Sequence, residues 1–143
     1  MTTQTTVPAF APAFAPAFVP AAGRVLIAAI FVLSGFSKIA APAVTIDYIA
    51  SVGLPLPQFA FAGAVVVELL GSLALVLGYK TRIVAAALAV FSILTALFFH
   101  NALGDQNQFI HFFKNVAITG GLLQIVAFGP GAFSLDGRSR KTA

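Results

Sequence analysis

Glu68 is the only charged residue in an apolar run, residues 59–77, that is long enough to cross a bilayer. In hydrocarbon a carboxylate is costly, and it persists where it faces a partner or a polar cavity. Two further charges, Lys38 and Lys114, lie inside other apolar segments. One carboxylate and two ammonium groups at similar depth can pair with one another, relay protons or hold the polar part of a small ligand. The chemistry therefore depends on whether these three side chains face one interior.

Residue spacing places the three charges at related depths. With a helical rise of ~1.5 Å per residue, Lys38 lies about 21 Å along its helix from Arg24, and Lys114 lies at a similar depth. Glu68 precedes Gly78 by ten residues, which corresponds to about 15 Å. Lysine side chains of ~6 Å can span such a difference. Four polar residues are expected beside or above this layer: His100, Asn101, His111 and Asn115.

Small residues share helix faces with the charged ones, as at packing faces between membrane helices. They occur in all four apolar segments: Ser34 and Gly35; Ala64, Gly71 and Ser72; Ala85, Ala89, Ser92 and Ala96; and Gly121. We therefore expect an inward cluster of Glu68, Lys38 and Lys114. His100, His111 and Asn115 are expected to roof this cluster.

Two interpretations of this cluster remain open. It can be a structural network that fixes helix register, or a polar pocket for a small ligand, a quinone head group or a proton relay. Metal ligation by His100, His111 and Glu68 is disfavoured because their spacing matches no helical ligand motif. No nucleophile elbow, phosphate-binding loop or dinucleotide-binding motif is present in the sequence.

Composition identifies the elements that must position these residues. The mean hydropathy is +1.00, and 8% of residues are charged against about 25% in soluble domains. Only helices and closed barrels span a bilayer, and continuous apolar runs favour helices over alternating strands. The sequence predicts an all-α integral membrane protein, an antiparallel four-helix transmembrane bundle. Its spans are expected at residues 24–41, 57–78, 82–100 and 112–128.

The segments around the spans predict the domain organisation. Residues 1–22 carry a repeated Pro-Ala-Phe pattern and are expected to be a disordered tail. Residues 23–129 form the four-helix domain, and residues 130–143 form a basic cytoplasmic tail. A short interfacial helix is expected at residues 43–51, with Tyr48 near the headgroups. Gly78 is expected to end the second span, and Thr81 is expected to cap the third.

The distribution of basic residues predicts the orientation. Four spans place both termini and the 78–82 turn on one side of the membrane. That side carries six basic residues: Arg24, Lys80, Arg82, Arg138, Arg140 and Lys141. The positive-inside rule therefore places both termini in the cytoplasm of a bacterial cell. The lack of Cys excludes disulfides and thiol redox chemistry within this chain, and basic residues at span ends argue against a nucleic-acid partner.

Several short stretches, in this order, also resemble the DoxX family of membrane proteins over residues 24–136. They are Ser34-Gly35-Phe36-Ser37-Lys38, Glu68-Leu69-Leu70-Gly71, Gly78, Arg82, Lys114-Asn115 and the tail Gly129-Pro130-Gly131-Ala132-Phe133-Ser134-Leu135-Asp136. The resemblance implies a small four-helix inner-membrane protein. The family name derives from subunits linked to thiosulfate:quinone oxidoreduction, and some members are placed in oxidative-stress complexes.

The resemblance and the charge cluster together suggest a function. We expect a subunit that binds a quinone-type molecule or anchors partners in a membrane redox system, rather than a complete oxidoreductase. The candidate binding residues are Glu68, Lys38, Lys114, His100, His111 and Asn115. A carrier for a small anion or a proton-coupled solute is the first alternative, and a non-catalytic membrane scaffold is the second. Partners are expected to be the lipid bilayer, quinone, and redox subunits or further copies of the chain.

Overall fold

The computed structural model describes residues 16–139, and within them all regular secondary structure is helical. The elements are α1 (Val19–Ala40), α2 (Pro42–Ser51), α3 (Pro57–Leu77), α4 (Thr81–Phe99), α5 (Gln106–Phe128) and α6 (Leu135–Ser139). Four of these helices, α1, α3, α4 and α5, are long and apolar enough to cross a membrane. Their outward faces carry large exposed apolar side chains such as Leu26, Leu33, Leu70 and Ile83. The predicted all-α, four-span membrane fold is confirmed.

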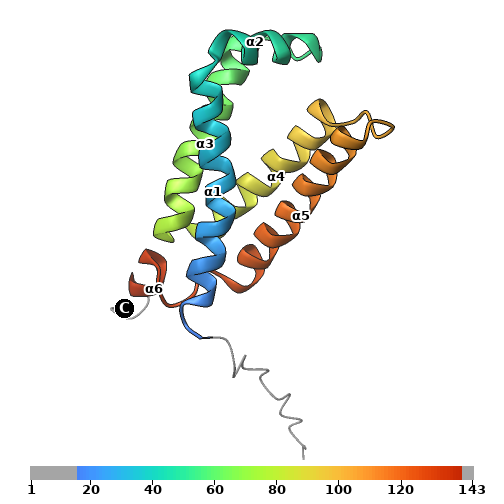
Figure 1. The fold of residues 1–143 in the computed structure, drawn as a ribbon. Helices are drawn as coiled ribbons and strands as arrows, with labels where there is room; N and C mark the ends of the chain where they lie inside the picture. The colour runs from blue at the N-terminus through green and yellow to red at the C-terminus, as the bar shows by residue number, and fades with distance from the viewer. Residues whose placement is uncertain (1–15, 140–143) are drawn as a thin grey trace, which may run out of the picture.

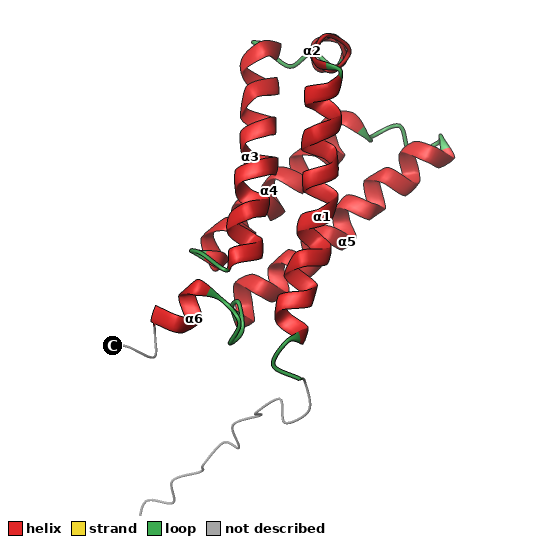
Figure 2. Ribbon diagram, turned by 60° about the vertical axis from the view of Figure 1, so that its left-hand side comes forward, coloured by secondary structure: helices red, strands yellow, loops and turns green. Residues whose placement is uncertain are grey.

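The four long helices are arranged as two antiparallel pairs, α1 with α3 and α4 with α5 (Figure 1). The pairs meet at the end that carries α6, and they lean apart toward the end that carries α2 (Figure 2). The buried core lies between the pairs at the α6 end. It comprises Ala28, Phe31, Leu75, Ala85, Leu88, Ala89 and Leu122. The packing is therefore uneven along the bundle, and it is tightest at the α6 end.

Glycines allow the two pairs to approach closely where the core lies. A Cβ on Gly71 of α3 would lie 3.1 Å from Leu88 of α4, and one on Gly121 of α5 would lie 3.1 Å from Ile27 of α1. Within the first pair, Ser72 is fully buried. These residues were expected on packing faces, and the structure confirms that expectation.

Helix ends follow recognisable local signals. α1 begins at Val19, five residues before the expected start of the span at Arg24, because Pro20 fits the first turn, where its missing N–H costs no hydrogen bond. α3 begins with Pro57 in the same way and ends at Gly78, whose φ of 68° favours glycine. α5 is capped by Asp105, whose carboxylate accepts from the Gln108 N–H at 2.8 Å.

The short helix expected between the first two spans is present as α2. It lies across the ends of α1 and α3 that are farthest from α6 (Figure 1). Tyr48 on α2 donates its hydroxyl to the Phe99 carbonyl at 3.0 Å, and the two rings lie 5.5 Å apart. This contact joins α2 to the end of α4. The position of α2 in the membrane interface remains a prediction.

The C-terminal segment folds back against the α3–α4 turn. The Asp136 carboxylate accepts from the Lys80 N–H at 2.9 Å, the Thr81 N–H at 2.8 Å and the Thr81 hydroxyl at 2.7 Å. It thereby caps α4 from a distant part of the chain. The expectation that Thr81 itself caps α4 is wrong: the capping position is Lys80, and Thr81 is the first helical residue.

Arg24 holds the start of α1 against the same segment. Its side chain is buried and donates to the Leu75 carbonyl at 3.1 Å and to the Phe133 carbonyl. Leu75 lies in the last turn of α3, where a cation also interacts favourably with the helix dipole. We call the contacts of Arg24 and Asp136 the terminal clasp. The disordered tail was expected over residues 1–22; this expectation is wrong for residues 19–22, which form the first turn of α1. Residues 1–15, and the basic residues Arg140 and Lys141, lie outside the described part of the chain.

Candidate functional site

The centre of the candidate site is an ion pair between the first two spans. Lys38 Nζ of α1 lies 2.8 Å from Glu68 Oε1 of α3. Ser34 completes a triangle: its hydroxyl accepts from Lys38 at 2.7 Å and donates to Glu68 Oε1 at 3.0 Å. The Glu68 side chain is 4% exposed, whereas that of Lys38 is 23% exposed. The predicted contact between Glu68 and a lysine inside the bundle is confirmed for Lys38.

The backbone of α1 approaches α3 closely beside this pair. Gly35 lies against α3, and a Cβ there would meet the Leu69 side chain at 2.7 Å. Lys38 follows Ser34 by one helical turn, so both side chains lie on the same face of α1. The hydroxyl of Ser72 on α3 donates to the Glu68 carbonyl, one turn back along the helix. The spacing of small and charged residues on α1 therefore builds the pair directly.

Glu68 also lines a cavity of about 200 Å³ between the two helix pairs. We call it the polar chamber, because six of its ten other lining residues are polar. These are Ser34 of α1, Ser92 and Thr95 of α4, His100 directly after α4, and Lys114 and Asn115 of α5. Four of the five predicted partners of Glu68 thus have a place at this chamber or in the ion pair. Phe31 of the core forms part of its floor.

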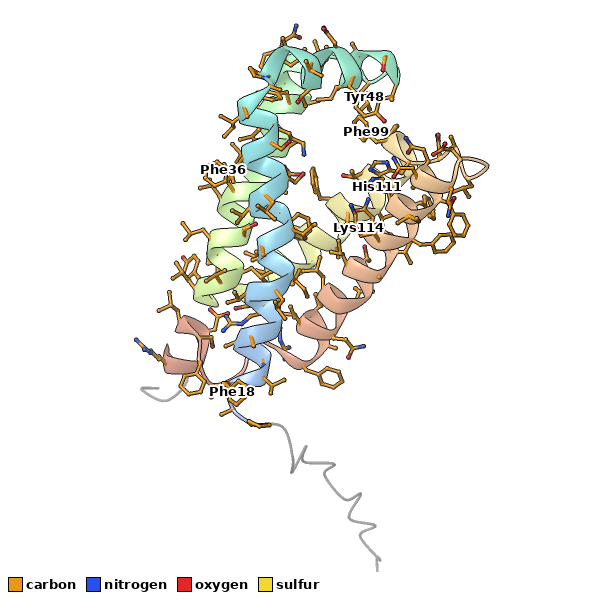
Figure 3. The ribbon with its side chains drawn as sticks, viewed as in Figure 1. Phe18, Phe36, Tyr48, Phe99, His111 and Lys114 are labelled. Atoms are coloured by element: carbon orange, nitrogen blue, oxygen red, sulfur yellow. The ribbon has the colours of Figure 1, made fainter. Side chains whose placement is uncertain are left out.

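Lys114 does not pair with Glu68, contrary to the expected three-residue cluster. Its ammonium donates to His111 Nδ1 at 2.8 Å, on the same helix, and the residue is exposed. Figure 3 shows Lys114 and His111 on the side of α5 toward α1, while Phe36 points away from that interior. The reason is that α5 leans away from α3 at this level, so equal depth along the helices does not bring the side chains together.

The expected roof of polar residues is partly assembled. The rings of His100 and His111 stack with their centroids 5.0 Å apart, and His100 Nδ1 lies 2.9 Å from Gln108 Oε1. The side-chain amide of Asn115 donates to the His111 carbonyl at 3.2 Å. Asn101 is exposed and lines neither of the two cavities described here. His111 does not line either cavity itself, and it contacts three residues that line the polar one, Lys114, His100 and Asn115.

A second cavity of about 510 Å³ lies between α1, α2, α3 and α4. We call it the apolar chamber, because its walls are mainly aliphatic and aromatic, among them Ile49, Leu54, Leu94, Phe98 and Phe99. Its polar lining includes Lys38, Tyr48 and Thr45. Ser34, Phe91, Thr95 and His100 line both chambers, so the two cavities adjoin. The volume lies within the roughly 300–1,000 Å³ of small-molecule sites.

Sequence reasoning missed Thr95 and Tyr48 as lining residues. Thr95 follows Ser92 by three residues and precedes His100 by five, so helical spacing from Ser92 could have placed it on the inward face. Tyr48 was assigned to the interface from its aromatic type alone. Its contact with Phe99 depends on how α2 folds over the bundle, which has no signature in the local sequence.

Comparison with known proteins agrees with this architecture. The DoxX family model matches residues 19–101, which span α1 to α4 and include Lys38, Glu68 and His100. Lys114, His111 and Asn115 lie beyond the matched residues. No solved structure matches the chain.

Two curated relatives come from Escherichia coli (strain K12). The chain is 35% identical to inner membrane protein YqjF over 113 residues, which cover 79% of this chain and 85% of that protein. It is 38% identical to inner membrane protein YphA over 120 residues, with coverages of 80% and 86%. A Surfeit locus protein 4 homolog of Drosophila melanogaster is 37% identical over 90 residues, but only 32% of that protein is covered. With four apolar spans and these matches, the chain belongs to the DoxX family of membrane proteins.

Proposed function

We propose that this protein binds a small lipid-soluble molecule of the quinone type in the apolar chamber, as a binding or anchoring subunit of a membrane redox system. Its proposed location is the bacterial inner membrane, as for its relatives YqjF and YphA, with both termini in the cytoplasm. Any step of that system that needs a thiol would fall to partner subunits, since this chain contains no Cys.

The observation that carries the proposal is the position of the Lys38 ammonium. An ammonium group has three N–H donors, and among residues 16–139 two of them have partners, Ser34 and Glu68. Lys38 also lines the apolar chamber. A third N–H is therefore free to donate to a carbonyl oxygen. The head group of a quinone offers two such carbonyl oxygens as hydrogen-bond acceptors.

The rest of the apolar chamber suits the same ligand. Aromatic side chains of Phe91, Phe98 and Phe99 can pack against a flat ring. A few polar groups that converge in an apolar cleft are the usual form of a small-molecule site. The ring contact of Tyr48 with Phe99 lies at the α2 side of this chamber.

A titration of the purified protein with a short-chain ubiquinone analogue tests the proposal. Binding in mild detergent is followed by thermal shift and by tyrosine fluorescence, since the chain contains no Trp. Lys38→Ala should weaken binding by about tenfold or more, because a hydrogen bond to a charged group contributes roughly 1.5–3 kcal/mol. Lys80→Ala is the matched control, since Lys80 lies in the α3–α4 turn at the far end of the bundle and should leave binding unchanged.

The same titration separates the competing functions. Quinone binding that is absent, or that survives Lys38→Ala unchanged, would refute the proposal. Uptake of a small anion or of protons by vesicles that contain only this protein would favour the carrier. If neither quinone binding nor uptake is observed, and partner subunits still assemble with the protein, the result favours the non-catalytic membrane scaffold.

A further inference from the structure

Two buried polar atoms, on residues that line the polar chamber, have no hydrogen-bond partner among residues 16–139. They are Glu68 Oε2 of α3 and Ser92 Oγ of α4. Glu68 is 3% exposed and Ser92 is 1% exposed. Buried side-chain oxygens are normally bonded, so both atoms need an explanation. The ion pair with Lys38 does not supply one, because it uses the other carboxylate oxygen, Oε1.

Ser92 differs in this respect from the other hydroxyls inside the helices. Ser72 and Thr95 each donate to the carbonyl four residues earlier, which is the common arrangement in a helix. The Ser92 hydroxyl makes no such bond among the described residues. A rotation of the Ser92 side chain would turn this hydroxyl toward the chamber that the residue lines.

The chamber is large enough and polar enough to hold water. Its volume of about 200 Å³ exceeds several times the roughly 30 Å³ that one water molecule takes in the liquid. Both atoms are closed off from the open space of the chamber in this geometry. A rotation of each side chain would bring its oxygen to water held by Ser34, Thr95 and Asn115, and such water would satisfy both atoms. Such waters would also connect Glu68 to the other ionisable groups at the site.

Those ionisable groups lie on or directly after every long helix around the chamber. Lys38 of α1 pairs with Glu68, His100 directly after α4 and Lys114 of α5 line the chamber, and His111 of α5 accepts from Lys114. With Gln108 Oε1 as acceptor, His100 Nδ1 carries a hydrogen, and the other ring nitrogen is an acceptor in the neutral ring. Lys114 is exposed and so connects the chamber to the surroundings of α5.

We infer that the polar chamber is a hydrated proton-exchange site, in which Glu68 binds and releases a proton at Oε2. The proton passes through chamber water between Oε2 and the exposed side of the chamber at Lys114, and it returns by the same route. A protonated carboxyl is a donor as well as an acceptor, so the proton supplies a bond that the ion cannot make. This inference concerns a different cavity from the quinone site and needs no bound quinone.

Infrared spectroscopy of the full chain in phosphatidylcholine vesicles tests this inference. A pH titration should reveal a carboxylic-acid carbonyl band that is missing in Glu68→Gln. On transfer to D₂O the band should shift quickly, since water reaches Oε2. Ser92→Ala should slow the exchange about tenfold, which corresponds to the loss of roughly one hydrogen bond from the path.

Ser72→Ala is the control, because Ser72 is equally buried but lines neither chamber, and it should leave exchange unchanged. Lys114→Met gives a second variant at the exposed side, and it should also slow exchange. The inference is overturned if no acid band depends on Glu68 at any pH at which the protein stays folded. It is equally overturned if Ser92→Ala and Lys114→Met both exchange as fast as the unaltered protein. Neither result bears on quinone binding, which the Lys38 titration measures separately.

Discussion

Lys38→Met isolates the energetic contribution of the ion pair, because methionine keeps a long apolar side chain and removes only the charged group. The change takes away the 2.8 Å contact with Glu68 Oε1 and leaves Ser34 as the remaining partner of that oxygen. Removing one partner of a fully buried pair costs about 3–5 kcal/mol, whereas exposed pairs contribute about 0–1 kcal/mol. Since Lys38 is 23% exposed and its head group is only partly desolvated, we expect a loss of about 1–3 kcal/mol.

Reversible unfolding in mixed detergent micelles, followed by circular dichroism, measures this loss. Lys114→Met is the matched control. Its ammonium is exposed and bonded to His111 rather than to a carboxylate, so we expect a loss below about 1 kcal/mol. Equal losses in the two variants would refute the argument that the pair, rather than the general removal of charge, stabilises the bundle.

A double-mutant cycle with Glu68→Gln gives a sharper answer. If the two charges interact, Lys38→Met should cost less in the Glu68→Gln background than in the original protein, by about 1–2 kcal/mol. The physical reason is that the neutral amide no longer leaves an uncompensated buried charge. Strictly additive losses would mean that Lys38 and Glu68 are neighbours without energetic coupling.

Three further outcomes are expected. Gly35→Ala should destabilise the protein relative to Gly63→Ala, because a Cβ at Gly35 meets Leu69 at 2.7 Å and one at Gly63 meets nothing within 4 Å; overpacking costs about 1–3 kcal/mol in unfolding experiments. Asp136→Ala should remove the distant cap of α4, lower the stability by about 0.5–2 kcal/mol and speed proteolysis of the C-terminal segment. A reporter that is active only in the periplasm, fused after residue 143, should be silent; activity would reverse the predicted topology.

Local sequence signals were sufficient for the four spans and for the prediction that Glu68 contacts a lysine, but they did not choose between Lys38 and Lys114. Helix interiors are specified by continuous apolar runs, and Lys38 and Ser34 lie one turn apart on a face lined by Gly35. A carboxylate with no alternative partner in an apolar span then needs this lysine or an equivalent one. These constraints act within one helix or between neighbouring helices, so spacing alone captures them.

The position of Lys114 and the terminal clasp could not be predicted in the same way. Helical rise places a residue along the axis but says nothing of how far a helix leans. The helix α5 leans away from α3 (Figure 1), and Lys114 lies on this leaning helix (Figure 3). The sequence places Arg24 only as a basic residue at the cytoplasmic end of a span, and Asp136 only in the tail stretch that resembles the family. Their partners lie 109 and 55 residues away, Phe133 and Thr81, and no local pattern indicates such contacts.

The uneven packing of the bundle explains where a site can exist. A close-packed interior leaves few voids larger than a water molecule, so a ligand site in four helices requires that they separate. The terminal clasp and the glycine contacts of Gly71 and Gly121 hold the two pairs together at one end. Glu68 lies just beyond the core, where the pairs begin to diverge and where both chambers open. Loosening the clasp should therefore change the chambers as well as the stability, so Asp136→Ala ought to alter quinone affinity from the opposite end of the molecule.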